Sequence, residues 1–239
     1  MDTVNVVKKR LKGSLRAVFL TGAGVSAESG VPTFRGEGGL WRNFRPEELA
    51  TPGAFKKDPW LVWQWYDWRR KILSGVRPNA GHRALSEIEK EKGAEGCTLI
   101  TQNVDGLHQG AGSTNVLELH GSIWRLRCVL CAAAAENREV GLEEIPRCAC
   151  GGLLRPAVVW FGEQLPEEVI TAAVEAAGKA DFMMVIGTSG VVQPAASLAV
   201  RAKENGAYVV EVNTEATPLT SIMDVTLQGR AGDILPLLL

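Results

Sequence analysis

Short apolar runs that end in turn residues recur along this chain. They lie at 17–20, 97–100, 116–119, 182–186 and 208–212. Runs with so few polar positions are typical of strands that are buried on both faces, as in a parallel sheet. Helix-like stretches separate several of these runs, at 79–93, 166–178 and 194–206. The alternation predicts an α/β fold with a Rossmann-like, doubly wound, mostly parallel sheet.

Two segments interrupt this alternation and are expected to lie outside the main sheet. The first, at 35–74, is rich in Trp, Pro and charged residues and is expected to be a helical insert. The second, at 123–152, contains four of the five cysteines and is expected to be a smaller zinc-binding module. The main domain would then consist of residues 1–34, 75–122 and 153–239.

The composition permits a full hydrophobic core, since 46% of the 239 residues are hydrophobic. The formal net charge of -1 argues against electrostatic binding of nucleic acid. The apolar run after the basic N-terminal residues is far too short for a signal sequence or a membrane span. We therefore expect a cytoplasmic protein with no membrane partner, in which thiols stay reduced.

The cysteine pattern predicts a metal site. Cys128-x-x-Cys131 and Cys148-x-Cys150 are separated by 16 residues, and two close pairs of this kind suit one tetrahedral zinc ion. Four thiolates leave no open coordination position, so the zinc is expected to be structural. The fifth cysteine, Cys97, lies in an apolar run and is expected to be a core residue.

A glycine-rich turn directly follows the first predicted strand. Residues 22–27 read Gly-Ala-Gly-Val-Ser-Ala, which matches the pattern G-x-G-x-x-G/A of dinucleotide-binding turns. Such a turn lets the backbone approach a pyrophosphate at a helix N-terminus, although an ordinary tight turn has the same pattern. No second strand ends in an acidic residue about 20 positions later, as it would in a dehydrogenase. The cofactor is therefore expected to lie differently from that of a hydride-transfer enzyme.

Polar residues follow four of the predicted strands: Gln102, Asn103 and Asp105; His120; Gly187, Thr188 and Ser189; Asn213, Thr214 and Glu215. In an open α/β sheet, ligands bind at the carboxyl ends of the strands. A histidine there can act as a general base near neutral pH. The alternative is that these residues only cap the next helix or belong to the core.

The motifs at 22–30, 34–36, 101–105, 119–121, 187–189 and 213–215, together with the four cysteines, occur in this order from Gly22 to Ala231. In this combination the chain resembles the sirtuins, the NAD-dependent protein lysine deacylases. The resemblance implies NAD as co-substrate, one structural zinc ion and acyl-lysine proteins as partners. It leaves the oligomeric state open.

The resemblance also implies roles for individual residues. His120 would be the general base, and Asn103 would complete the catalytic pair. The segment Val159-Trp160-Phe161-Gly162-Glu163 would pair with the substrate peptide through its backbone. The expected cofactor contacts are Gly22, Ala23, Gly24, Ser26, Glu28, Thr33, Phe34, Arg35, Trp41, Gln102, Asn103, Asp105, His120, Gly187, Thr188, Ser189, Asn213, Thr214, Glu215 and Ala231.

The acyl group is suggested by two residues of the Trp-rich segment. Tyr66 and Arg69 are spaced i, i+3 and share one face of the predicted helix. Together they can bind a carboxylate, and their spacing resembles that of the sirtuin subgroup that removes succinyl, malonyl or glutaryl groups. The sequence therefore predicts removal of succinyl or malonyl groups, and of acetyl groups as well. The alternative is an aromatic surface helix with an incidental arginine, since Arg70 and Lys71 are adjacent.

Two other functions fit parts of the same pattern. A mono-ADP-ribosyltransferase would use NAD but transfer the ribose to another nucleophile. A catalytically silent acyl-lysine-binding protein, or a zinc-stabilised scaffold, would keep the fold without the chemistry. The presence of His120, Asn103 and Asp105 argues against silence.

Overall fold

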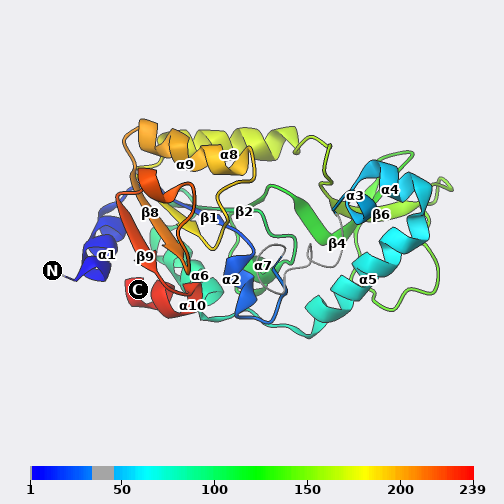
Figure 1. Ribbon diagram of the computed structural model, residues 1–239, viewed down its shortest axis with the longest axis horizontal. Coiled ribbons are helices and arrows are strands. Elements are labelled where there is room, and N and C mark those ends of the chain that lie inside the picture. Colours follow the sequence, from blue (N-terminus) through cyan, green and yellow to red (C-terminus); the bar gives the residue numbers. More distant parts are fainter. Residues whose placement is uncertain (1, 34–45) are drawn as a thin grey trace.

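The computed structural model describes residues 2–33 and 46–239 and contains a six-stranded parallel sheet with strand order β3-β2-β1-β7-β8-β9 (Figure 1). The strands are β1 Ala17–Thr21, β2 Cys97–Thr101, β3 Val116–Glu118, β7 Phe182–Ile186, β8 Tyr208–Asn213 and β9 Val225–Gln228. From β1 the strand order runs through β2 to β3 at one edge of the sheet, and from β7 it runs through β8 to β9 at the other edge. This confirms the predicted Rossmann-like fold and places its topological switch point between β1 and β7.

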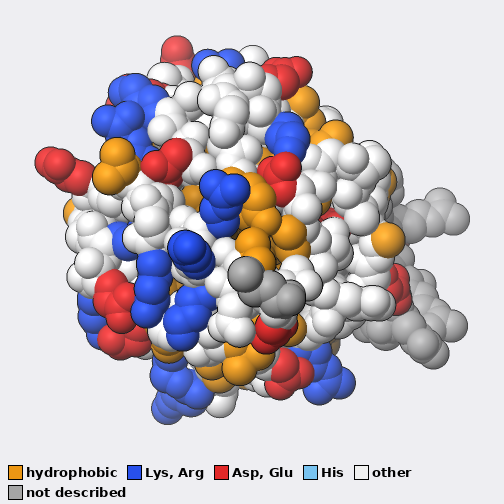
Figure 2. Space-filling view, turned by 90° about the vertical axis from the view of Figure 1, so that its left-hand side faces the viewer, with side chains coloured by type: hydrophobic (Ala, Val, Ile, Leu, Met, Phe, Trp, Pro, Cys, Tyr) orange, Lys and Arg blue, Asp and Glu red, His pale blue; other side chains and the backbone are white. Residues whose placement is uncertain are grey.

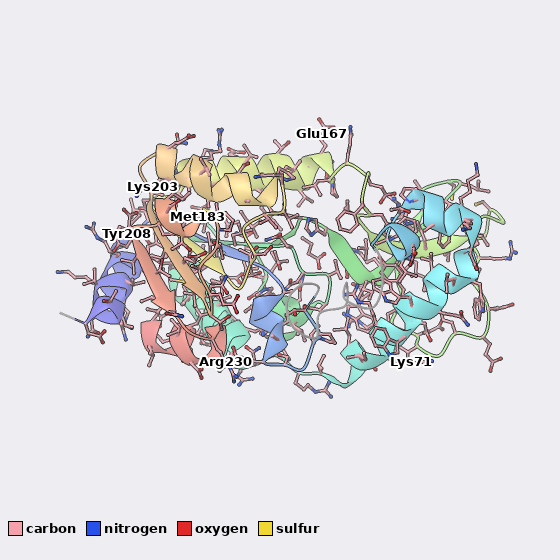
Figure 3. The ribbon with its side chains drawn as sticks, in the orientation of Figure 1. Lys71, Glu167, Met183, Lys203, Tyr208 and Arg230 are labelled. Atoms are coloured by element: carbon pink, nitrogen blue, oxygen red, sulfur yellow. The ribbon has the colours of Figure 1, made fainter. Side chains whose placement is uncertain are left out.

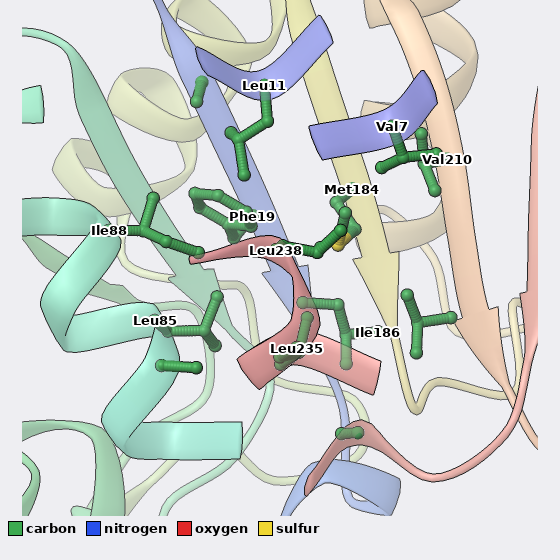
Figure 4. Packing of buried hydrophobic residues seen from close by; sticks show 14 of the residues in the cluster. Val7, Leu11, Phe19, Leu85, Ile88, Met184, Ile186, Val210, Leu235 and Leu238 are labelled. Atoms are coloured by element: carbon green, nitrogen blue, oxygen red, sulfur yellow. The ribbon is translucent and has the colours of Figure 1, made fainter. Parts of the chain in front are cut away.

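Helices cover both faces of this sheet. Alternate residues of each strand point to opposite faces, so Phe19 and Met184 pack on one side while Leu20 and Met183 pack on the other. Figure 4 shows the first of these cores, where Leu11, Leu85 and Leu235 meet the sheet, and Figure 3 labels Met183 in the second. The first face is covered by α1 Thr3–Gly13, α6 Ala80–Lys92, α10 Ala231–Ile234 and the 3-10 turn η3 Leu235–Leu238, and the second by α8 Glu167–Lys179 and α9 Ala195–Glu204.

The end of the molecule near α1 is shown in Figure 2, where Lys and Arg side chains lie beside a smaller hydrophobic area. Helix α1 buries Val7 and Leu11 and exposes Lys9, Arg10 and Lys12. This split explains the helix, which the sequence analysis did not predict. Too few of its residues are apolar for a strong pattern, but the two that are buried share one face.

A smaller lobe is built from the predicted insert and the cysteine region. Its helices are α3 Pro46–Leu49, α4 Pro52–Lys57 and α5 Pro59–Gly75, and its antiparallel sheet has the order β5-β4-β6, with β4 Gly121–Cys128, β5 Ala134–Glu136 and β6 Leu154–Val158. One core joins them, in which Trp63 and Tyr66 of α5 pack with Trp124 and Trp160. The two predicted excursions thus share a core. Strand β4 begins before the predicted range 123–152, and β6 lies entirely after it.

Three short elements lie among the loops at the carboxyl ends of the strands: α2 Gly24–Ala27, α7 Leu107–Gly110 and the 3-10 turn η2 Thr220–Ile222. Each is too short to leave a periodic pattern in the sequence. No helix in the described part of the chain is long and apolar enough to span a membrane.

Candidate active site

Three glycines bring two strand-end loops together at the switch point. The Gly24 N–H donates to the Gly187 carbonyl at 2.8 Å. A Cβ atom on Gly24 would lie 2.7 Å from the Gly187 Cα, and one on Gly22 would lie 2.8 Å from the Gly187 oxygen. Gly187 itself has φ +57°, a conformation that favours glycine. The turn after β1 therefore packs directly on the loop after β7, a close approach that the sequence pattern did not reveal.

Side-chain amides link the strand ends to one another. Gln102 Nε2 donates to Thr188 Oγ1 at 3.0 Å, and Asn213 Nδ2 donates to the Thr188 carbonyl at 2.8 Å. Asn103 Nδ2 donates to the Gly22 carbonyl at 3.0 Å. The loops after β1, β2, β7 and β8 thus form one continuous polar edge.

The capping alternative holds for only one of these residues. The Asp105 side chain accepts from the Leu107 N–H at the start of α7, at 2.9 Å. Helix α9 has Pro194 as its N-cap, so Thr188 and Ser189 do not cap it. His120 precedes a strand rather than a helix. Capping therefore does not account for the accumulation of polar residues at this edge.

His120 is held in one orientation at the end of β3. Its Nδ1 lies 2.9 Å from the Gln102 carbonyl, which can only accept, so Nδ1 carries the proton and Nε2 has the free electron pair. Burial lowers the pKa of His120, and the bond to Gln102 opposes that shift. The backbone is fixed as well: the His120 carbonyl accepts from the Val159 N–H at 2.9 Å. Gly121 has φ +74°, and a Cβ atom there would lie 2.1 Å from the Ala157 oxygen.

A buried polar network lies next to these residues. Ser26 Oγ donates to Asp105 Oδ2 at 2.8 Å and accepts from Asn103 Nδ2 at 3.2 Å. His82 Nε2 lies 3.3 Å from Ser26 Oγ, and His82 Nδ1 accepts from the Asn79 N–H. Because Nδ1 is an acceptor, the neutral His82 ring carries its proton on Nε2 and donates to Ser26. The sequence predicts His82 only as part of the helix at 79–93. Its one signal is the residue pattern Asn79-x-x-His82, a capping box.

His108 is the second buried imidazole of this network. Its Nε2 lies 2.9 Å from Thr21 Oγ1, and its ring centroid is 4.9 Å from that of His82. Burial lowers the pKa of His108 to about 3 and that of His82 to about 4. Both rings are therefore neutral at physiological pH. Asn103 and Asp105 are connected to this network through their hydrogen bonds with Ser26.

Some of the remaining predicted cofactor residues lie at the polar edge of the sheet, and others lie outside the described residues. Glu28 accepts from the Gly232 N–H at 2.9 Å and so joins α2 to the start of α10, where Ala231 lies. Ala23 is half-buried in the turn after β1, and Thr33 lies where the first described range ends. Ser189, Thr214 and Glu215 are exposed at the same edge. Phe34, Arg35 and Trp41 lie outside the described residues.

The predicted peptide-binding segment follows β6 and is tightly bonded. Four of its N–H groups donate within the chain: Val159 to His120, Trp160 to the Glu163 side chain, Phe161 to Ala50 and Glu163 to Trp160. In this conformation a peptide strand can pair with the segment only through its carbonyl groups and the Gly162 N–H. The Phe161 side chain is 49% exposed and lies on the surface of the segment.

Tyr66 and Arg69 are buried side chains of α5, which excludes the surface-helix alternative for this pair. Their exposed fractions are 1% and 7%. Burial lowers the pKa of Arg69, and charge interactions with Tyr66 and Asp105 oppose that shift. Arg69 also lines a small cavity together with Val31 and Pro32, which follow the turn after β1. Arg69 therefore extends from the small lobe toward the polar edge of the sheet, and Tyr66 packs in the core of the small lobe.

The four predicted metal ligands converge. The sulfur atoms of Cys128, Cys131, Cys148 and Cys150 all lie within 4.8 Å of one another. Zinc–sulfur bonds of about 2.3 Å in a tetrahedron require sulfur atoms about 3.8 Å apart. Backbone N–H groups of Cys131 and Leu130 lower the pKa of Cys128 to about 6, which favours the thiolate. The donor set and its geometry fit one structural zinc ion.

The chain matches the Sir2 family over residues 22–194 and therefore belongs to that family. A curated relative, NAD-dependent protein deacylase 2 of Pyrobaculum aerophilum, is 57% identical and aligns with 95% of this chain and 90% of its own length. The NAD-dependent protein deacylase of Aquifex aeolicus is 56% identical and aligns with 92% of each chain.

Solved structures agree with these sequence matches. A Sir2 homologue in complex with NAD has a TM-score of 0.92 and 48% identity, with 100% of this chain and 93% of that chain covered. A Sir2 protein bound to a myristoylated histone peptide has a TM-score of 0.77 and 35% identity, with 98% and 94% covered. The comparisons confirm the predicted family, fold, cofactors and enzyme class, an NAD-dependent protein deacylase with a four-cysteine zinc site.

Proposed function

We propose that this protein removes succinyl, malonyl and acetyl groups from protein lysines, with His120 as the general base. The observation that supports this proposal best is the orientation of His120. Its Nδ1 is bonded to the Gln102 carbonyl, so Nε2 is the basic atom. Because burial lowers its pKa, the ring is in the neutral form that can accept a proton near pH 7.

The residues at the carboxyl edge of the sheet suit a dinucleotide. The turn at Gly22 and Gly24 presents backbone without side chains, and Asn213 and Gln102 supply polar groups on either side of Thr188. When bound, NAD would supply the ribose carbon to which the acyl oxygen adds as nicotinamide leaves, and addition of water would then release free lysine and O-acyl-ADP-ribose. His120 takes a proton from a ribose hydroxyl at Nε2, and Asn103 and Asp105, fixed by Ser26, shape the nicotinamide side.

Tyr66 and Arg69 support the acidic acyl groups. A buried guanidinium is a strong partner for a carboxylate, and a buried phenol can donate a second hydrogen bond. The charge interaction between Arg69 and Asp105, a residue proposed for the nicotinamide side, supports this assignment. An acetyl group has no carboxylate and makes neither contact, so it needs only enough room in the acyl-binding site.

The test is incubation of succinyl-lysine and acetyl-lysine peptides with the protein, with and without NAD. We expect NAD-dependent release of free lysine from both peptides. His120→Ala is expected to slow both reactions by roughly 10²- to 10⁴-fold, the usual contribution of a general base. Full activity of His120→Ala, or deacylation without NAD, would refute the proposed role.

Arg69→Met tests the acyl class. Loss of a charge-assisted contact to the acyl carboxylate is expected to reduce desuccinylation roughly 10- to 100-fold and to leave deacetylation within about threefold. Lys71→Met is the control, because Lys71 is an exposed cation on the same helix, paired with Asp67 at 3.0 Å. Equal losses on both peptides with Arg69→Met would count against an acidic acyl group.

A further inference from the structure

We infer that the Trp160 side chain is a positioning residue that makes Tyr66 a hydrogen-bond donor to the acyl carboxylate. This inference rests on the proposed acyl class and adds a residue to it. The indole nitrogen of Trp160 lies 2.9 Å from the Tyr66 hydroxyl oxygen. Both side chains are buried, with exposed fractions of 2% for Trp160 and 1% for Tyr66.

The direction of this hydrogen bond follows from the chemistry of the indole. An indole nitrogen can only donate, so the Tyr66 oxygen has to accept from it. The single proton of the phenol must then point away from Trp160 and toward a different acceptor. Arg69, its neighbour on the helix, has no acceptor atom. Tyr66 and Arg69 therefore both present donors, which is the arrangement that an acceptor-only carboxylate requires.

Trp160 is held so that its N–H cannot turn away. The Arg155 guanidinium carbon lies 3.3 Å from the centroid of the Trp160 ring, and Phe55 packs with its centroid 5.4 Å from that ring. Arg155 in turn donates to both carboxylate oxygens of Glu163, at 2.6 and 2.9 Å. Glu163 also accepts from the Trp160 backbone N–H at 2.9 Å. The ion pair between buried Arg155 and partly exposed Glu163 thus fixes both the ring and the backbone of Trp160.

The consequence concerns selectivity between acyl groups. Without the Trp160 N–H, the phenol proton has no imposed direction, and part of its population no longer donates to a carboxylate. An acetyl group makes no bond to Tyr66, so this loss applies to the acidic acyl groups and lowers the succinyl-to-acetyl ratio. Because Trp160 belongs to the segment 159–163, the predicted peptide-binding backbone and the acyl-binding hydroxyl are connected through one side chain.

Trp160→Phe tests the inference, because it keeps an aromatic ring and removes the N–H. We expect the succinyl-to-acetyl ratio of kcat/KM to fall by up to about tenfold, because one hydrogen bond to a charged group is weakened while any change in peptide binding affects both substrates alike. Trp63→Phe is the matched control. Trp63 is a buried tryptophan of the same lobe whose Nε1 donates to the Leu154 carbonyl at 2.8 Å, so it should not change the ratio of the two substrates.

A double variant separates positioning from packing. If Trp160 acts through Tyr66, then Trp160→Phe causes no further change in the succinyl-to-acetyl ratio once Tyr66→Phe is present. Additive changes in the ratio would overturn the inference, and so would equal losses on both peptides with Trp160→Phe alone. If Trp160→Phe does not fold, Tyr66→Phe still tests the premise of the inference: equal losses on both peptides overturn it, because Tyr66 then donates no bond that Trp160 could direct.

Failure of the proposed function gives a different result. A wild-type protein that does not remove succinyl groups, or an Arg69→Met variant without selectivity, refutes the acidic acyl class and this inference with it. A selective Arg69→Met variant combined with an unselective Trp160→Phe variant refutes the inference alone.

Discussion

The three histidines of this chain show how environment decides the role of one residue type. His120 has one nitrogen bonded to a carbonyl and the other available at the polar edge of the sheet. His82 and His108 are buried beside Ser26 and Thr21, where desolvation disfavours the charged form. The sequence identified His120 through its position after a strand. It could not identify His82, because the contact with Ser26 joins residues far apart along the chain.

We expect the free energy of unfolding to fall as the pH drops from 6.5 toward 4. The pKa of both buried histidines is lower in the folded state than the usual 6.5, so the unfolded state binds protons first in this window. Above pH 6.5 both histidines are neutral in the folded and in the unfolded state, so their protonation does not lower the free energy of unfolding. Below it, each histidine removes about 1.4 kcal/mol per pH unit, until the pH reaches its folded pKa.

Denaturant unfolding at a series of pH values measures this dependence. The slope of the unfolding free energy against pH gives the number of protons taken up on unfolding. His82→Gln is expected to lower that number by about one between pH 6.5 and 4. A slope that is the same in the wild type and in His82→Gln would mean that His82 is not neutral in the folded protein.

At the scale of elements, the active site depends on how two loops meet. The pattern G-x-G after β1 predicted a backbone turn and an anion, and the turn is present. Its main contact, with the loop after β7, was not predictable, because Gly187 lies in a different part of the sequence. Five strands of the six-stranded sheet were predicted because their apolar runs are continuous, whereas β9, with Thr226 and Gln228 exposed, and the three strands of the small sheet were not predicted. The short elements α2, α7 and η2 were missed because four or fewer residues carry no periodicity.

Gly24→Ala tests this close approach. Its Cβ atom would lie 2.7 Å from the backbone of Gly187, so one of the two loops has to move. We expect the variant to lose about 1–3 kcal/mol of stability and to bind NAD more weakly. Gly75→Ala is the control, because a Cβ atom at this helical glycine meets nothing within 4 Å. Thermal unfolding and NAD titration of both variants provide the measurement, and equal stability of the two would contradict the packing described.

At the scale of the whole molecule, the four-cysteine module and helix α5 form one lobe. The Gly141 N–H donates to Asp67 at 2.8 Å, and Arg70 donates to Asn137, so α5 is bonded to the loop that follows β5. The sequence predicted the insert and the module as separate excursions. Their common core could not be predicted, because its contacts join segments on either side of β2, as the bond from Trp63 to Leu154 does.

Removal of zinc is expected to abolish deacylation and to leave NAD binding largely intact, because the cysteines lie in the small lobe and the strand ends that suit NAD lie in the six-stranded sheet. Replacement of zinc by cobalt should preserve activity, since four thiolates leave no coordination position for chemistry. Chelation followed by NAD titration and peptide assay measures both effects. Full deacylase activity in metal-free protein would contradict a structural role for the metal in this lobe.

Product analysis by mass spectrometry tests the central claim most directly. With a succinyl-lysine peptide and NAD, we predict that free peptide, nicotinamide and O-succinyl-ADP-ribose form in equal amounts, and that all three fall together in His120→Ala. ADP-ribose attached to protein would indicate a transferase instead. Free succinate formed without nicotinamide would contradict the account altogether.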